Sequence, residues 1–262
     1  MLPEPALFPW VALAFGLVVG SFANVCVHRL PRGQSVVWPA SSCPLCGSPI
    51  RPWHNLPLLG FALLGGFCGR CRQPISLRYP VVEAANGSLY FLIASTRGPS
   101  ASAVAAMAFA SALLVLSLVD LEHHLLPDAI TLPGIALGLA ASFLAGPPGP
   151  LEAAGSAAFG YLGMGAVARL AEWYYGHEAL GRGDWKMAAM LGAFFGARPT
   201  LLTLFLATAA GATLGLTLIA TGRLSRRSPL PLGTFLGLAG LCVLLFGDRL
   251  LAWYDGVLRL GG

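Results

Sequence analysis

The chain has 262 residues, of which 56% are hydrophobic and only 10% charged, with a mean hydropathy of +0.73 and a formal net charge of +5. A soluble domain would carry about a quarter charged residues, so the composition excludes an ordinary soluble protein and predicts an all-α, multi-pass membrane protein. No basic cluster indicates binding to nucleic acid, and the partner that the composition predicts is the lipid bilayer.

Apolar runs account for most of this hydrophobicity. They cover residues 6–27, 81–95, 101–119, 129–145, 151–170, 187–197, 201–220 and 230–246. A helix perpendicular to the bilayer needs about 20 residues, and several runs, above all 187–197, are shorter. We therefore predict seven or eight transmembrane helices. The chain then divides into a first transmembrane helix at 1–27, a small cysteine-rich loop domain at 28–80 and a membrane-embedded domain at 81–262.

Basic residues set the expected orientation, because cytoplasmic loops carry an excess of Lys and Arg. With eight spans and the N-terminus outside, 12 of the 16 basic residues fall on the cytoplasmic side and 4 outside. The twelve are Arg29, Arg32, Arg51, Arg70, Arg72, Arg78, Arg169, Arg182, Lys186, Arg223, Arg226 and Arg227, and the four are Arg97, Arg198, Arg249 and Arg259. We predict an outside N-terminus and a cytoplasmic loop domain.

The loop domain contains two Cys-x-x-Cys pairs, Cys43 with Cys46 and Cys68 with Cys71, separated by 21 residues. Each pair forms a tight turn that directs two sulfurs at one point, and tetrahedral zinc needs two such turns. The cytoplasm keeps thiols reduced, which argues against structural disulfides. We predict one structural zinc bound by four thiolates; a redox-active or metal-free set of thiols is the alternative. We predict no internal repeat.

Two acids, Asp120 and Asp184, lie at the cytoplasmic ends of apolar runs. A carboxylate at the edge of a lipid-embedded bundle costs about 2–3 kcal/mol, which makes both residues functional candidates. Asp184 follows Gly181 and Gly183, and glycine allows backbone turns that a Cβ would forbid. Asp184 could alternatively cap the helix that follows it. We expect the two carboxylates to meet at one face of the membrane.

The segment after Asp120 contains other polar residues for which a structural role is the simpler interpretation. Asp128 follows a proline and opens an apolar run, which suits a helix N-cap. Adjacent histidines on a helix point to different faces, so we interpret His123 and His124 as solvated loop residues rather than metal ligands.

Two carboxyl groups held close together cannot both ionise cheaply, so they share a proton near neutral pH. One can then act as a base on water while the other, protonated, polarises a carbonyl, as in aspartic proteases. The alternative is a zinc-stabilised membrane transporter that moves protons or cations through intramembrane carboxylates. Transporters more often place such acids near the middle of a span. These physical arguments alone leave both functions open.

Several segments, in order along the chain, resemble the type IV prepilin peptidases. They are Gly20-Ser-Phe-Ala-Asn-Val25, His28-Arg-Leu-Pro31, the two cysteine pairs, Ser76-Leu-Arg-Tyr-Pro-Val-Val-Glu83, Asp120-Leu-Glu-His-His-Leu-Leu-Pro-Asp128, and Gly181-Arg-Gly-Asp184 with Glu178, Lys186 and Met187. A single Gly-x-Gly-Asp motif would be weak, but this ordered set is specific to the family and covers residues from about 16 to 246.

The resemblance implies that Asp120 and Asp184 are the catalytic pair and that 81–262 is an aspartic peptidase domain. It implies cleavage of a basic leader from type IV prepilins or pilin-like precursors of type II secretion or DNA-uptake machines, at the cytoplasmic face of the bacterial inner membrane. It also implies methylation of the new amino terminus with S-adenosylmethionine, an activity that the family associates with its cysteine-containing loop. The sequence itself contains no identifiable motif for binding a methyl donor.

Overall fold

The computed structural model of the chain describes residues 4–144, 146–176, 180–225 and 230–260. Glu178 of the family motif and the predicted cytoplasmic Arg226 and Arg227 lie outside the described residues. Over the described ranges the secondary structure is helical, with no strand longer than an isolated bridge. Each predicted apolar run is α-helical over most of its length, which confirms the all-α prediction.

Among the described helices, four are long and apolar enough to cross a membrane. They are Leu7–Arg32, Ala101–His123, Ala197–Ala220 and Leu232–Val257, while Asp128–Ala141 is a shorter apolar helix. The number of spans, seven or eight, stays a prediction.

The chain forms two compact units, Met1–Ser111 and Ala112–Gly262. The first contains α1 (Glu4–Arg29), η1 (Leu30–Arg32), η2 (Pro52–Asn55), α2 (Leu59–Leu63), α3 (Arg78–Arg97) and the beginning of α4 (Ala101–His123). The second contains the rest of α4, α5 (Asp128–Ala141), α6 (Pro150–Tyr175), α7 (Arg182–Phe195), α8 (Ala197–Ala220) and α9 (Leu232–Leu260). The predicted division at residues 27 and 80 stays a prediction.

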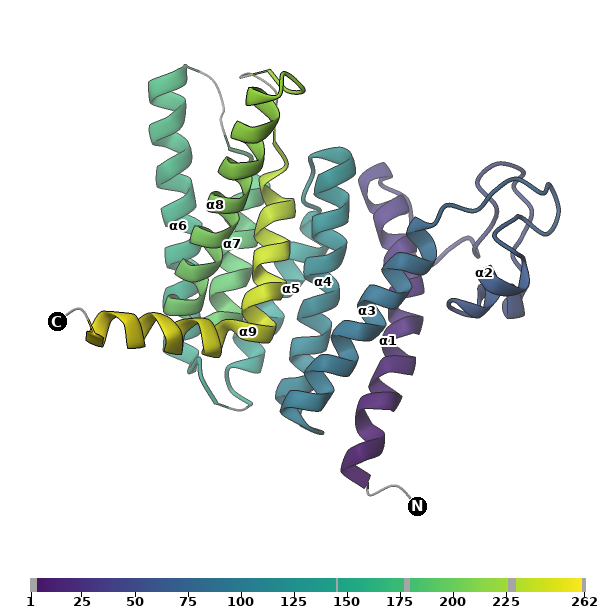
Figure 1. Ribbon diagram of the computed structural model, residues 1–262, viewed down its shortest axis with the longest axis horizontal. Helices are drawn as coiled ribbons and strands as arrows, with labels where there is room; N and C mark the ends of the chain where they lie inside the picture. Colours follow the sequence, from purple (N-terminus) through teal and green to yellow (C-terminus); the bar gives the residue numbers. More distant parts are fainter. Residues whose placement is uncertain (1–3, 145, 177–179, 226–229, 261–262) are drawn as a thin grey trace. The chain divides into compact units, whose positions relative to one another are not determined.

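In the first unit, α1 and α3 lie against each other (Figure 1). Their contact is close because glycines face the partner helix: a Cβ on Gly16 would lie 2.9 Å from the Cα of Gly87, and one on Gly20 would lie 2.8 Å from the Cα of Glu83. Asn86 is fully buried in this contact and donates from Nδ2 to the Gly16 carbonyl at 2.7 Å. The pair presents the C-terminal end of α1 and the N-terminal end of α3 to the cysteine-rich segment.

In the second unit, α7 is the central helix. All residues from Met187 to Ala193 are buried, and a helix that is hydrophobic on every side belongs in a core. Glycines again permit the contact: a Cβ on Gly192 would collide with the backbone of Ser156 on α6, and one on Gly134 of α5 would lie 3.0 Å from the Met190 Cγ. This packing fixes the position of the first turn of α7, which carries Asp184.

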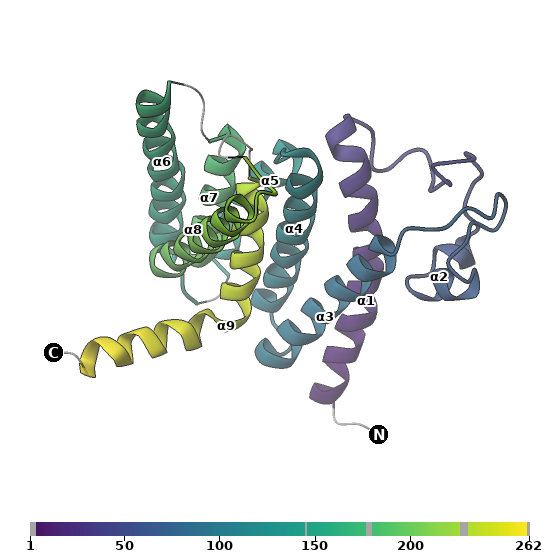
Figure 2. The same cartoon turned by 45° about the horizontal axis from the view of Figure 1, so that its top comes forward.

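The helix α9 extends well beyond the predicted apolar run, which ends at residue 246. Its C-terminal part bends and runs across the direction of the other helices of the second unit (Figure 1; Figure 2). An ion pair joins this part to the start of α8, with Arg198 Nη2 2.6 Å from Asp255 Oδ1. Hydropathy alone does not predict the extension, because the helix continues with interspersed charged residues.

Candidate active site and metal centre

Asp120 lies in the last turn of α4 and is only 6% exposed. One of its carboxylate oxygens, Oδ2, accepts two hydrogen bonds from Thr234 at the start of α9. The Thr234 backbone N–H donates at 2.7 Å, and its hydroxyl lies at 3.2 Å. The carboxylate is therefore held at a helix N-terminus, where the first N–H groups have no partner within their own helix.

Asp184 lies in the first turn of α7, and Gly181 is the N-cap of that helix. The side chain of Leu126 lies between the elements that carry the two acids. A Cβ on Gly183, next to Asp184, would lie 2.8 Å from the Leu126 Cβ, and a Cβ on Gly233, next to Thr234, would lie 2.9 Å from both Leu126 Cδ1 and the Asp120 Cγ. Asp120 and Asp184 therefore both lie next to elements that contact Leu126 in the second unit, and they are close enough to influence each other electrostatically.

Asp184 lies outside the four long candidate spans and outside the predicted run 187–197. Burial, and then the nearby charge of Asp120, raise the pKa of the Asp184 carboxyl to about 6. Two carboxyls that influence each other in this way share protons as a pair.

The expectation that the two glycines before Asp184 provide backbone freedom for a turn is not supported by their conformation. Neither Gly181 nor Gly183 has a positive φ, so neither glycine is needed for a left-handed turn. Gly183 is needed for space, because a side chain there would collide with Leu126. A Cβ on Gly181 would make only ordinary contacts, the nearest with Asp184 Oδ2 at 3.6 Å.

The predicted N-cap role of Asp128 is wrong. Asp128 is the first residue of α5, its N-cap is Pro127, and no side chain caps the helix. The Asp128 carboxylate instead accepts from Lys186 Nζ at 2.6 and 2.7 Å, which joins α5 to α7. The predicted loop position of His123 is also wrong, because it ends α4 and is half-buried, whereas His124 follows the helix and is exposed.

The cysteine-rich segment folds into two matching turns. In the first, the Cys43 N–H donates to the Ser48 carbonyl at 2.9 Å; in the second, the Cys68 N–H donates to the Gln73 carbonyl at 2.8 Å. Isolated bridges, Ser42 with Pro49 and Phe67 with Pro74, close the two turns. The segments share the pattern Cys-x-x-Cys-x-x-Pro-Ile, at 43–50 and 68–75. The prediction of no internal repeat is therefore wrong, because this short repeat extends each cysteine pair by a common Pro-Ile.

The two turns bring four thiols together. The ligand atoms of Cys43, Cys46, Cys68 and Cys71 all lie within 4.8 Å of one another, and all four cysteines are free. Tetrahedral zinc with Zn–S bonds of about 2.3 Å requires sulfurs about 3.8 Å apart. Cys43 Sγ and Cys71 Sγ are 3.9 Å apart, so the cluster can hold a metal ion of this kind.

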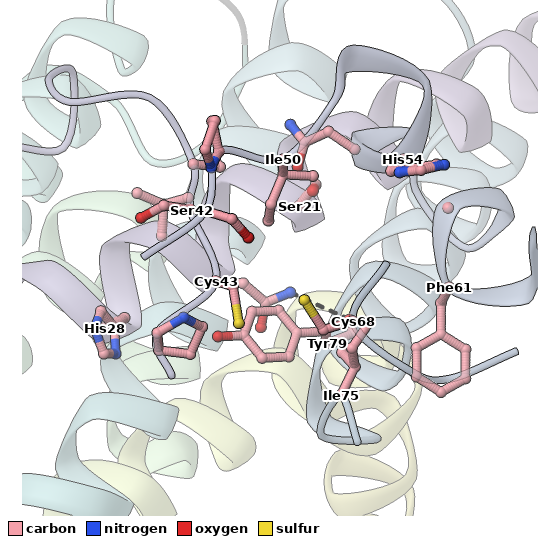
Figure 3. Close-up of a pocket in the computed structure, with 18 of the residues that line it drawn as sticks. Ser21, His28, Ser42, Cys43, Ile50, His54, Phe61, Cys68, Ile75 and Tyr79 are labelled. Atoms are coloured by element: carbon pink, nitrogen blue, oxygen red, sulfur yellow. Dashed lines mark hydrogen bonds between the residues drawn. The ribbon is translucent and has the colours of Figure 1, made fainter. Parts of the chain in front are cut away.

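A cavity of about 1300 Å³ lies beside the cysteine turns in the first unit. Figure 3 shows Cys43, Cys68 and Tyr79 around it. Asn24 from α1 also lines the cavity and is 2% exposed. Its Nδ2 donates to the Tyr79 carbonyl at 3.1 Å, whereas its buried Oδ1 has no hydrogen-bond partner. A buried acceptor without a partner in a cavity of this size indicates a place for a ligand.

Comparison with known proteins matches two family models to this chain. The model described as "Bacterial Peptidase A24 N-terminal domain" matches residues 14–96, and the one described as "Type IV leader peptidase family" matches residues 107–216. No solved structure matches the chain.

Similar proteins span nearly the same length. A protein of Pseudomonas aeruginosa is 37% identical over 96% of this chain and 94% of its own length. One of Pseudomonas putida is 39% identical over 95% of this chain and 94% of its own. One of Aeromonas hydrophila is 34% identical over 95% and 94% respectively. All three are named "Prepilin leader peptidase/N-methyltransferase".

Proposed function

Because this chain belongs to the type IV leader peptidase family, we propose that it removes the leader of type IV prepilins or pilin-like precursors and then methylates the new amino terminus. The observation that supports the cleavage proposal is the convergence of Asp120 and Asp184, at the ends of two helices of the second unit. A transporter is not supported, since the family is one of peptidases and both acids lie near helix ends rather than in the middle of a span.

The pair can hydrolyse a peptide bond without a cofactor. One carboxylate takes a proton from water, and the resulting hydroxide attacks the scissile carbonyl carbon. The other carboxyl, protonated, donates to the carbonyl oxygen as negative charge develops there. When the C–N bond breaks, the first aspartic acid gives its proton to the leaving amine, and the second takes its proton back from the hydroxyl of the tetrahedral intermediate as the C=O bond re-forms. The proton count then balances, and both groups are reset for the next turnover.

We propose that the four cysteines of the first unit hold a structural zinc, which fits the spacing of their sulfurs. Zinc would fasten the two turns together and add to the stability of a segment that has little helix. It takes no part in the cleavage step.

We assign methyl-donor binding to the cavity beside the cysteine turns. When bound, S-adenosylmethionine supplies an electrophilic methyl group to an amine. The residues that fit it are Asn24, whose buried Oδ1 offers an acceptor, and Tyr79 and His54, whose rings line the same cavity. The proposed location of both activities is the bacterial inner membrane, with the aspartate pair at the cytoplasmic face.

The test uses the purified full chain in lipid vesicles and a precursor with a basic leader. Asp120→Asn and Asp184→Asn should each lower the cleavage rate at least ~100-fold, because each removes one proton-transfer group. The matched control is Asp128→Asn, which removes only an exposed ion pair and should retain cleavage. Mass spectrometry of the product reads leader loss and methylation together. If Asp120→Asn were active and Asp128→Asn inactive, the catalytic acid of this segment would be Asp128 and not Asp120.

A further inference from the structure

Thr234 contacts Asp120, although it lies outside every motif identified in the sequence. Its backbone N–H and its hydroxyl both reach the same oxygen of Asp120, at 2.7 and 3.2 Å. The hydroxyl also lies 3.0 Å from the Ser117 carbonyl. Thr234 is 7% exposed and Asp120 is 6% exposed, so water competes little for these hydrogen bonds.

These contacts favour one ionisation state of Asp120. A backbone N–H can only donate, so the oxygen that accepts it does so best as a carboxylate oxygen. The Thr234 hydroxyl has one proton and two acceptors within reach, and an ionised carboxylate is the stronger of the two. The N-terminus of α9, a helix of 29 residues, adds its partial positive charge at the same point.

The position of α9 depends on a glycine beside Thr234. A Cβ on Gly233 would lie 2.9 Å from the Asp120 Cγ and from the Leu126 methyl groups, so a larger residue there would force α9, Leu126 or the carboxylate to shift. Two titratable groups interact with Asp120. Asp184 lies on α7, and His124 follows the end of α4. Burial and the nearby charge of Asp120 favour the protonated form of Asp184.

We propose that Thr234 is a positioning residue that holds Asp120 as the ionised member of the pair, which makes Asp120 the general base and leaves the shared proton on Asp184. This assignment of roles rests on the proposed peptidase function. Oδ2 is occupied by the Thr234 donors, and Oδ1 receives the proton of the attacking water. In this role Thr234 acts through Asp120 and is not itself a catalytic residue.

The first test compares Thr234→Val, which keeps the backbone donor and the shape but loses the hydroxyl, with Thr234→Ser, which keeps both donors. Loss of a hydrogen bond to a charged group should lower kcat about 10- to 100-fold, with KM changed less than about twofold. The acid limb of the pH–rate profile should move to higher pH, because the carboxylate of the pair is less well stabilised. Thr234→Ser should restore both kcat and the profile.

Thr203→Val is the matched control. Thr203 is fully buried on α8 and donates to the Pro199 carbonyl at 2.8 Å, away from both aspartates. It should leave kcat and the profile unchanged. An unchanged profile in Thr234→Val, or an equal loss at every pH that serine does not restore, would show that Thr234 is merely structural.

A second measurement does not depend on cleavage. In an Asp184→Asn background, the infrared carboxylate signal that disappears on adding Asp120→Asn belongs to Asp120. Its titration midpoint should move to higher pH when Thr234→Val is added, and no movement would overturn the role of Thr234. If the wild-type chain cleaves no precursor, the peptidase proposal fails, and the infrared titration still decides whether Thr234 stabilises the Asp120 carboxylate.

Discussion

Around Asp184, two glycines of one motif have different physical requirements. Gly183 faces the Leu126 side chain at a distance that leaves no room for a Cβ, whereas Gly181 has open surroundings and an ordinary extended backbone. Leu126 is buried and also contacts the turn before Thr234, so it cannot move away without disturbing both ends of the site.

Gly183→Ala should therefore damage the site more than Gly181→Ala does. Overpacking against Leu126 should lower the free energy of unfolding by about 1–3 kcal/mol and slow leader cleavage. Gly181→Ala should cost less than about 1 kcal/mol, since only a weak N-cap preference is lost. Thermal unfolding and cleavage rates of the two variants make the comparison. Equal effects would mean that backbone freedom, not space, selects these glycines.

At this scale the sequence identifies two candidate acids but does not show how they are held. Asp120 and Asp184 could be selected because charge at the end of an apolar run is costly. Thr234 could not, because its contact with Asp120 joins positions 114 residues apart. The error at Asp128 has the same origin, because its partner Lys186 is 58 residues away.

Among the helices, α7 shows that the length of an apolar run does not indicate how deeply a helix is buried. The run 187–197 was the shortest of those predicted, yet α7 is the most completely buried helix stretch of its unit. Its neighbours reach it through glycines such as Gly160 and Gly138, whose contacts depend on the tertiary arrangement. Helix identity was therefore predictable from the sequence, whereas the packing order around α7 was not.

The two cysteine turns have different residues at one position where the backbone is left-handed. Gly47 and Arg72 occupy equivalent positions just after each Cys-x-x-Cys and have φ values of +68° and +56°. A residue with a Cβ pays about 1 kcal/mol or more in this left-handed region. Gly47 therefore adopts this conformation without strain, whereas the backbone strain at Arg72 must be offset by other interactions of the cysteine cluster.

We expect one zinc per chain by elemental analysis, and opposite effects of two substitutions on zinc retention. Gly47→Ala should weaken zinc binding roughly 5- to 10-fold in competition with a chelator, and Arg72→Gly should strengthen it by a similar factor. Circular dichroism of each variant controls for helix loss. Absence of stoichiometric zinc, or the same direction of change in both variants, would contradict the metal proposal.

For the whole molecule, each compact unit corresponds to one matched family model. Residues 14–96 fall within the first unit, and nearly all of 107–216 falls within the second. The four-cysteine cluster and the cavity belong to the first unit, and the aspartate pair belongs to the second. This separation suits a protein with two proposed chemical steps, since each site is built from contacts within its own unit.

The orientation of the whole chain in the membrane decides whether the aspartate pair can meet its substrate. A precursor with a basic leader keeps that leader in the cytoplasm for the same reason that 12 of this chain's 16 basic residues are predicted there. Leu125, which follows Asp120 closely, is 45% exposed, and Leu151 at the start of α6 is 90% exposed. The predicted topology places these two positions on opposite sides of the membrane.

Leu125→Cys and Leu151→Cys, in a Cys242→Ala background, test this topology with a membrane-impermeant thiol reagent. Leu125→Cys should react only in inside-out vesicles and Leu151→Cys only in right-side-out vesicles. The background protein without either new cysteine corrects for the reactivity of the native thiols. The reverse pattern would place Asp120 and Asp184 outside the cell, on the wrong side for a leader that its positive charge retains in the cytoplasm. Cleavage by this pair would then require the leader to cross the bilayer first, against the electrostatic preference that holds it inside.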